Sequence, residues 1–165
     1  MERYDQVLVA LRRIIRATDL HSKKLSKTSG LTSPQLLVLQ TLRDNSDLTV
    51  GEVARQVSLS QATVTTIVDR LERGEYVYRE RSKTDKRKVH VYLTDKAFGT
   101  LVAAPKPLQD DFIRQYQDLH DWEQTMILSS LERVAYMMDA QHIDAAPVLD
   151  IGALDRVDSA NKPQT

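Results

Sequence analysis

The chain has 165 residues, of which 41% are hydrophobic and 28% charged, and it contains no cysteine. This length suits one domain, or one domain with a helical extension. No apolar run reaches the roughly 18 to 20 residues of a membrane span, and the first residues lack a signal-peptide stretch. We therefore expect a cytoplasmic protein that does not enter a membrane. The lack of cysteine excludes disulfides and thiol chemistry.

The formal net charge is zero, but the charges are unevenly distributed along the chain. Residues 1–94 contain 17 Lys and Arg against 11 Asp and Glu, whereas residues 95–165 contain 6 against 12. The first part therefore has a net charge of +6 and the second a net charge of −6. Such polarity orients a molecule with its basic side towards a polyanion.

Two helices are expected in the first quarter of the chain. Apolar residues recur at spacings of three and four over residues 2–27, which predicts an amphipathic helix that needs a partner surface. After Gly30, Ser33 is expected to cap a second helix and Pro34 to take its first position, where the missing N–H costs nothing. This helix is expected to run to about Arg43.

Two shorter helices follow, separated by about three residues. Thr49 and Glu52 have the spacing of a capping box, and the apolar residues behind them follow a helical period. A turn at residues 58–60 leads into the next helix, which Gly74 is placed to end. Two short helices joined in this way are typical of a helix-turn-helix.

After Gly74 the period changes from helix to strand. Residues 76–79 and 89–94 alternate β-branched and aromatic residues with polar ones, and a polar, mostly basic segment separates them. This pattern predicts a hairpin with a long charged tip. The fold class is therefore mainly α with a small β-hairpin wing: a winged helix-turn-helix with helices before and after it.

A helical period returns from Asp95, and prolines interrupt it. Pro105 and Pro107 each remove a backbone donor, so we expect a kink or a break there. A further helix is expected to begin at Asp121, which has capping-box spacing to Gln124. The tail from about Gln141 is expected to be irregular.

The face of the fourth helix opposite its apolar stripe is polar. A helix fits the major groove of DNA, where Gln and Thr can hydrogen-bond base edges and Arg can hold phosphates. A polar face alone is more often simply solvated, but its place after a helix-turn-helix and before a basic hairpin favours DNA contact. The candidate residues here are Ser60, Gln61, Thr63, Thr65, Thr66, Arg70 and Arg73.

The hairpin tip is the second candidate DNA contact. Between Arg79 and His90 there are six Lys and Arg against two acids. An Arg can enter a narrow, A·T-rich minor groove, and Arg87 is the candidate for this role. Asp85 is expected to orient a neighbouring Arg through an ion pair. The candidates at the tip are Arg81, Lys83, Asp85, Lys86, Arg87 and Lys88.

Residues 31–95 resemble the core of the MarR (multiple antibiotic resistance regulator) family of transcriptional regulators. The likeness includes Thr84-Asp85-Lys86-Arg87-Lys88, in which Asp85 and Arg87 fall on the family's Asp-x-Arg wing signature. The resemblance implies a homodimer that binds a pseudo-palindromic operator on double-stranded DNA, as a repressor that a small ligand releases. It implies dimerisation helices at residues 1–30 and 96–140, a DNA-binding domain at 31–95 and an irregular tail at 141–165.

We expect two chains to pair through the apolar faces of the terminal helices, around Val7, Leu11, Ile14, Ile127, Leu131 and Val134. Two departures from the family stand out. Many members carry an Arg in the recognition helix where this chain has Thr66, so base specificity does not transfer. The Pro105 and Pro107 interruption bends a helix that is often continuous in the family, so the dimer geometry does not transfer either. A proline in this helix together with Trp122-Glu123-Gln124 resembles members linked to compatible-solute (ectoine) genes.

Other functions fit the sequence less well. An enzyme is disfavoured, because the four histidines lie far apart in the sequence and no nucleophile motif or Gly-rich phosphate loop is present. No metal site is assigned, because no paired His or Cys spacing appears, although a metal-responsive regulator stays an alternative. The other alternative is a winged helix that binds proteins instead of DNA. No cofactor is expected.

The effector ligand is unknown from sequence. Arg16 and His21 could pair with an anionic effector or form surface ion pairs, so no ligand residue is assigned.

Overall fold

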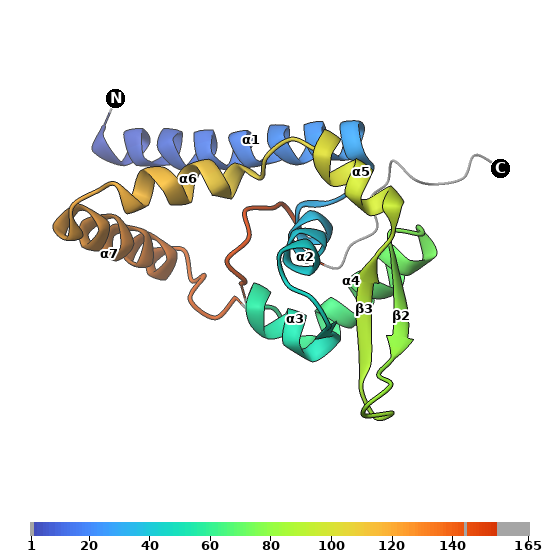
Figure 1. The fold of residues 1–165 in the computed structure, drawn as a ribbon. Helices are drawn as coiled ribbons and strands as arrows, with labels where there is room; N and C mark the ends of the chain where they lie inside the picture. The colour runs from blue at the N-terminus through green and yellow to red at the C-terminus, as the bar shows by residue number, and fades with distance from the viewer. Residues whose placement is uncertain (1, 144, 155–165) are drawn as a thin grey trace.

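The computed structural model describes residues 2–143 and 145–154. The chain is mainly helical with one small sheet, as the sequence predicts (Figure 1). In chain order the elements are α1 (Arg3–Ser29), α2 (Ser33–Asp44), β1 (Leu48–Thr49), α3 (Val50–Val57), α4 (Gln61–Arg73), β2 (Val77–Arg81), β3 (Val89–Leu93), α5 (Asp95–Ala103), α6 (Leu108–Gln117) and α7 (Asp121–Met137).

The start of α2 corrects one sequence prediction. Thr32, not Ser33, caps this helix: its Oγ1 accepts a hydrogen bond from the Gln35 backbone N–H at 3.4 Å. In return the Gln35 side chain accepts one from the Thr32 N–H at 2.9 Å. The helix therefore begins at Ser33, and Pro34 sits one position further in than expected, still within the turn where no N–H is needed.

The start of α7 corrects a second prediction. His120 precedes the helix, and its backbone N–H donates to the Glu123 carboxylate at 2.9 Å. The capping box thus begins one residue before the predicted Asp121. Gln124 instead donates to the Tyr116 carbonyl at 3.1 Å, which fastens α7 to the end of α6.

The structure contains a third strand, β1, which no sequence pattern predicts. The sheet has the order β1-β3-β2 and all its pairs are antiparallel. Leu48 pairs with Val91 and Thr49 with His90, so β1 is only two residues long and too short to show a period of two. Thr49 then caps α3 through the predicted capping box with Glu52.

The proline-rich segment between α5 and α6 breaks the chain's helical path. α5 ends at Ala103, Ala104 is extended, and α6 begins only after Pro107. The predicted interruption is therefore a complete break rather than a kink. α6 leaves the lobe that contains α2–α5 and extends, with α7, along the same side as the N-terminal half of α1 (Figure 1).

The hydrophobic core lies in the lobe formed by α2–α5 and the sheet. Its fully buried side chains come from several elements of this lobe, with Leu25 of α1 packed against them: Leu31, Leu36, Val38, Leu39, Val53, Val64, Ile67, Val68, Leu71, Val77 and Val91. Burial of such side chains stabilises each of them by about 1.5–3 kcal/mol. The winged helix-turn-helix therefore has a core of its own.

The three arm helices, α1, α6 and α7, are different, because a single chain leaves their apolar faces open. α6 and α7 bury no residue, and α1 buries only Thr18 and Leu25. Large apolar side chains on these helices are about half exposed: Val7, Leu8, Ile14, Ile15, Phe112, Ile113, Met126, Leu128 and Leu131. An exposed apolar surface of this extent marks an interaction site.

The described part of the tail contains no helix or strand over residues 141–143 and 145–154, as predicted. Asp150 of this segment accepts a hydrogen bond from Ser22 of α1 at 2.8 Å. The predicted irregular stretch from residue 155 onwards, including Pro163, lies outside the described residues. Among the helices described, none is long and apolar enough to span a bilayer.

Candidate nucleic-acid interface

The recognition helix α4 is held by its apolar face. Val64, Ile67, Val68 and Leu71 recur at helical spacing and are all buried in the core. At the start of the helix the Ser60 Oγ accepts a hydrogen bond from the Thr63 N–H at 3.1 Å. The core and the cap together fix the helix, so its opposite face is presented to solvent in a defined orientation.

The first two turns of that outer face present small neutral side chains. Thr65 Oγ1 donates to the Gln61 carbonyl at 2.8 Å, and Thr66 Oγ1 donates to the Ala62 carbonyl at 3.2 Å. Thr63 Oγ1 lies 2.8 Å from the Ser60 Oγ. Ala62 is also exposed on this face. It is not one of the predicted contacts, because the prediction relied on polar side chains and alanine has none.

The Gln61 carboxamide at the start of α4 lies over Gly51 of α3. A Cβ atom at Gly51 would be 3.5 Å from Gln61 Oε1, which is ordinary van der Waals contact. The side chain therefore extends across the outer surface of the helix-turn-helix between its two helices, where it is exposed to solvent.

Arg79 on β2 clamps the recognition helix to the wing. One guanidinium nitrogen donates to Asp69 Oδ1 at 2.6 Å and another to Glu72 Oε2, both on α4. Burial lowers the pKa of Arg79, but hydrogen bonds to the two carboxylates outweigh it and raise the pKa overall. The clamp occupies one carboxylate oxygen of Asp69, a residue that the helical period places on the polar face, while the side chain stays 42% exposed.

A network around Ser82 and Asp85 shapes the tip of the wing. Ser82 Oγ accepts hydrogen bonds from the Thr84 N–H at 3.3 Å and the Asp85 N–H at 3.2 Å. The Ser82 N–H donates to the Lys88 carbonyl at 3.0 Å, and this closes the loop. The loop is therefore ordered by its own side chains, although it is almost entirely polar.

The predicted ion pair of Asp85 with a neighbouring Arg is confirmed, and its partner is Arg87. Arg87 Nε donates to Asp85 Oδ1 at 3.1 Å, and the Arg87 backbone N–H donates to the same oxygen at 3.1 Å. These two bonds, led by the side-chain one, lower the pKa of the Asp85 carboxyl. The Arg87 side chain is nevertheless 92% exposed, so Asp85 sets its direction and leaves the guanidinium accessible.

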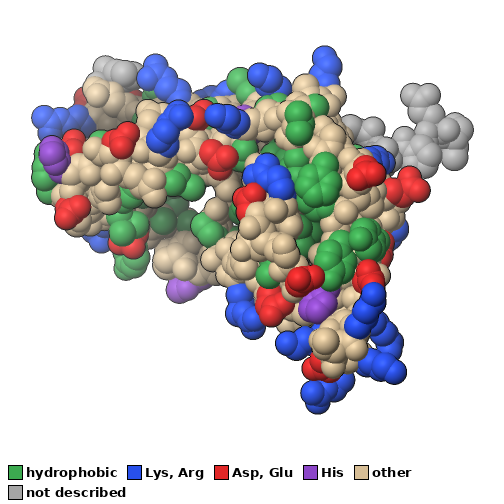
Figure 2. Space-filling view, in the orientation of Figure 1, with side chains coloured by type: hydrophobic (Ala, Val, Ile, Leu, Met, Phe, Trp, Pro, Cys, Tyr) green, Lys and Arg blue, Asp and Glu red, His purple; other side chains and the backbone are tan. Residues whose placement is uncertain are grey.

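The predicted DNA contacts form two groups, one on α4 and one at the wing tip. The space-filling view shows Lys and Arg side chains gathered around that tip (Figure 2). Ser60, Gln61, Thr65, Arg73, Arg81, Lys83, Lys86, Arg87 and Lys88 are exposed, whereas Thr63, Thr66, Arg70 and Asp85 are partly buried. Every predicted contact therefore has some surface available to a partner.

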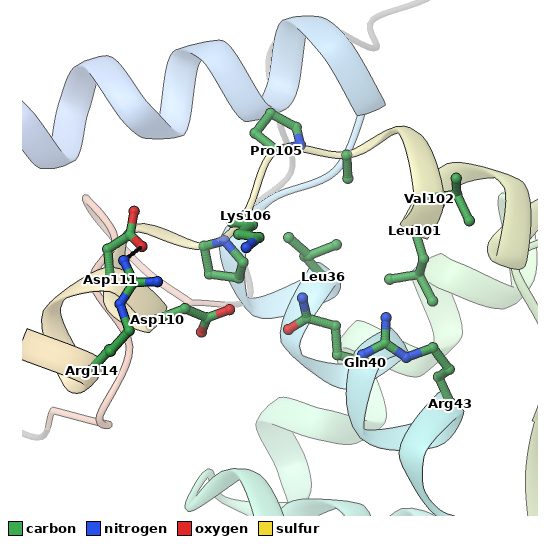
Figure 3. A pocket seen from close by; sticks show the side chains of 12 residues that line it. Leu36, Gln40, Arg43, Leu101, Val102, Pro105, Lys106, Asp110, Asp111 and Arg114 are labelled. Atoms are coloured by element: carbon green, nitrogen blue, oxygen red, sulfur yellow. Dashed lines mark hydrogen bonds and ion pairs between the residues drawn. The ribbon is translucent and has the colours of Figure 1, made fainter. Parts of the chain in front are cut away.

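A cavity of about 390 Å³ lies between the winged-helix lobe and the arm (Figure 3). Leu36, Gln40 and Arg43 line it from α2, while Asp110, Asp111 and Arg114 line it from α6. Burial, followed by the neighbouring Asp111, raises the pKa of Asp110. No sequence pattern signals this cavity, because the proline-rich linker brings α6 against α2 only in the folded chain.

The two residues considered for an effector do not line this cavity. Arg16 makes a surface ion pair with Asp19 at 2.7 Å. His21 is partly buried, and burial lowers its pKa. Among the described residues, no group of three or more His, Asp or Glu side chains is arranged to hold a metal ion.

The comparisons with known proteins match these observations. The sequence profile of the MarR family matches residues 31–89. The HTH-type transcriptional regulator MgrA of Staphylococcus aureus is 40% identical over 77 residues, which are 47% of this chain and 52% of MgrA. The chain thus spans about half the length of that curated relative. The matched relatives are named as transcriptional regulators rather than enzymes.

Solved structures extend the likeness to the arm helices. A MepR-like protein complexed with pseudoligands has a TM-score of 0.56 at 21% identity, covering 84% of this chain and 97% of its own. The PcaV transcriptional regulator of Streptomyces coelicolor, in complex with its natural ligand, has a TM-score of 0.54 at 25% identity, covering 78% and 91%. Residues 31–89 of this chain therefore resemble the MarR family of transcriptional regulators, whose sequence profile they match.

Proposed function

We propose that the chain is a sequence-specific DNA-binding regulator that acts in the cytoplasm, most simply as a repressor. One observation carries the proposal: the Arg79 clamp joins a capped, core-anchored recognition helix to β2, the strand that leads into the ordered basic wing tip. A helix of this kind fits the major groove, and an accessible Arg87 at the tip suits the flanking minor groove. The family match over residues 31–89 supports the same function.

The proposal includes a homodimer on a pseudo-palindromic operator. Residues 1–30 and 96–140 form the dimerisation arm, residues 31–95 bind DNA, and residues 141–165 form the tail. The exposed apolar side chains of α1 and α7, including Val7, Ile14 and Leu131, support this division. Two recognition helices about 34 Å apart would then reach successive major grooves.

The test is binding of the purified chain to the intergenic DNA beside its own gene. Fluorescence anisotropy would compare this duplex with a scrambled one of the same composition, at two salt concentrations. We expect tight, selective binding that weakens steeply with salt, because each neutralised phosphate releases a counterion. Equal weak binding to both duplexes would mean that the operator lies elsewhere in the genome. A selection from random sequences would then identify the operator sequence. No binding at either salt would favour the protein-interaction alternative.

A small-molecule effector is the second part of the proposal. The cavity between α2 and α6 lies where the DNA-binding lobe meets the arm, so a ligand there could alter the angle between them. The structure of PcaV with its natural ligand supports the idea by analogy. Compounds that raise the melting temperature should also release DNA in the binding assay. A Gln40→Leu variant should lose both effects if the cavity is the site.

The finer resemblance to regulators of compatible-solute genes stays a proposal that rests on the proline break and the Trp122-Glu123-Gln124 sequence alone. Deletion of the gene should change transcripts of solute-synthesis genes at high osmolarity. Unchanged transcripts would remove this target.

A further inference from the structure

The first two turns of α4 lack the side chains that DNA-binding proteins use most often to read guanine. No Lys or Arg occurs between Gln56 and Asp69 of the sequence. Guanine shows only acceptors, N7 and O6, in the major groove, and a bidentate Arg or Lys is its commonest partner. The nearest arginines on this helix, Arg70 and Arg73, lie in the last turn, whereas base contacts in a helix-turn-helix come from the N-terminal part.

The hydroxyls of Thr65 and Thr66 cannot replace those missing donors. A hydroxyl has one proton, and Thr65 and Thr66 both donate theirs to carbonyls of their own helix, at 2.8 Å and 3.2 Å. One proton of the Ser60 and Thr63 pair is likewise held between the two oxygens, which lie 2.8 Å apart. What Thr65 and Thr66 offer outward is therefore methyl groups and oxygen lone pairs.

The acid on the same helix lies beyond the N-terminal part that contacts bases, and Arg79 occupies one of its oxygens. Asp69 could accept from the amino group of cytosine, but it is bound to Arg79 at 2.6 Å. Glu72 is bound to the same guanidinium. The face that remains consists of the Ala62 methyl, the threonine methyls, the Gln61 carboxamide and the one hydroxyl proton of the Ser60 and Thr63 pair that their shared bond does not use.

We propose that α4 reads A·T base pairs, through contact of the Ala62 and Thr66 methyls with thymine C5-methyl groups and a hydrogen-bonded pair between Gln61 and adenine. Thymine is the base that shows a methyl in the major groove, and Gln pairs bidentately with adenine N6 and N7. The operator half-site then has A·T pairs under the recognition helix and no guanine anchor. Arg87 adds to this preference, because A·T tracts narrow the minor groove and attract arginine.

This inference rests on the proposed function, so the experiment separates the two. The full chain first selects duplexes from a random pool, and the recovered half-site is then synthesised with single-atom changes. Deoxyuridine in place of thymidine removes only the C5-methyl, whereas 7-deazaguanine removes only the guanine N7 acceptor. No enrichment of any sequence would contradict the proposed function itself. Enrichment of half-sites anchored on guanine would overturn the inference and leave the function standing.

We expect each deoxyuridine that removes a contacted methyl to weaken binding about fourfold, which corresponds to about 0.8 kcal/mol per buried methylene-sized group. The 7-deazaguanine duplex should bind within about twofold of the unmodified duplex, since α4 makes no contact with guanine N7. The reverse pattern, sensitivity to 7-deazaguanine and indifference to deoxyuridine, would overturn the inference.

Two conservative variants of one residue assign the methyl contact to Thr66. Thr66→Ser keeps the hydroxyl and loses the methyl, so deoxyuridine at the one thymine that Thr66 contacts should no longer weaken binding. Deoxyuridine at a thymine that Ala62 contacts should still weaken it. Thr66→Val keeps a methyl and loses the hydroxyl, so it should still prefer thymidine. Helix content and melting temperature of both variants show that they fold. Loss of the preference in Thr66→Val together with its retention in Thr66→Ser would overturn the assignment.

Discussion

Among single residues, Arg87 at the wing tip is expected to contribute to DNA affinity but not to the stability of the fold. The Arg87 side chain is 92% exposed, and among the described residues its ion pair is with Asp85 in the same loop. We predict that Arg87→Ala weakens operator binding about tenfold, the lower part of the range for removal of one arginine from a groove, without changing the melting temperature. Titration by fluorescence anisotropy and thermal unfolding measure the two quantities.

A matched control exists in the same lobe. Arg43 is exposed at the end of α2 and pairs with Asp44 at 2.8 Å, much as Arg87 pairs with Asp85. Arg43→Ala removes the same charge and the same kind of pair away from the wing. If both variants lose affinity equally, net charge rather than the placement of Arg87 explains the effect.

The Arg79 clamp predicts a different combination of effects. Arg79 is only 25% exposed and binds two carboxylates of α4. Arg79→Ala leaves Asp69 and Glu72 without their partner, so we expect a loss of about 1–2 kcal/mol in the free energy of unfolding, together with weaker DNA binding. Urea denaturation and the anisotropy assay test this. Asp69→Asn combined with Glu72→Gln in the Arg79→Ala background should restore much of the DNA binding if the stranded charges repel phosphate.

The hydrogen bond of Tyr92 in β3 is expected to make the stability of the fold depend on pH. Its hydroxyl donates to Asp47 at 2.7 Å, and this bond, followed by burial and the negative charge of Asp47, raises the pKa of Tyr92 to about 12. Because the folded pKa exceeds the unfolded value of 10.0, the bond stabilises the fold below pH 10. This stabilisation disappears as the pH rises from 10 to 12. Ultraviolet titration of the chain minus that of Tyr92→Phe should show a tyrosine with a pKa near 12, and Asp47→Asn should move it towards 10.

At the scale of elements, the sequence was sufficient wherever one pattern decides the structure. The amphipathic stripes of α1, α2, α3 and α4 and the alternation of β2 and β3 predicted these elements, because local periodicity decides which face is buried. β1 was missed, since two residues cannot show a period. Cap positions were wrong by one residue at Thr32 and His120, where neighbouring residues compete for the same N–H groups. The Arg79 clamp depends on the register between α4 and β2, which no local pattern contains.

The exposed apolar side chains of the arm helices lead to a prediction about dimerisation. Leu131 on α7 is 48% exposed in a single chain and lies on the face assigned to dimerisation. Leu131→Asp would bury a charge in the interface, so we expect a monomer by sedimentation velocity and loss of tight operator binding. Ile143→Asp in the tail is the control, since Ile143 is 69% exposed and lies outside the two segments predicted to form the interface. A dimer that survives Leu131→Asp would place the interface on other residues.

Across the whole molecule, the positive charge is concentrated in the part of the chain that contains the proposed DNA contacts. Residues 1–94, which include α4 and the wing, have a net charge of +6, and the remainder a net charge of −6. Such a field draws the winged-helix lobe towards DNA and turns the acidic arm away. Zero net charge for the chain as a whole is therefore compatible with a polyanionic partner.

The salt dependence of binding tests this division of charge. Lys86 and Lys88 are exposed at the wing tip, and replacing both with Gln should reduce the slope of log affinity against log salt by about 2 per subunit, since each phosphate that is no longer neutralised removes roughly 0.9. Asp118 and Asp121 are exposed on the arm, and replacing both with Asn changes the net charge by the same amount in the opposite sense. Since charges further apart than a Debye length of about 8 Å are screened at physiological salt, the arm variant should leave the slope unchanged. Equal and opposite changes in the two variants would mean that DNA responds to the total charge of the protein and not to contacts made by the wing.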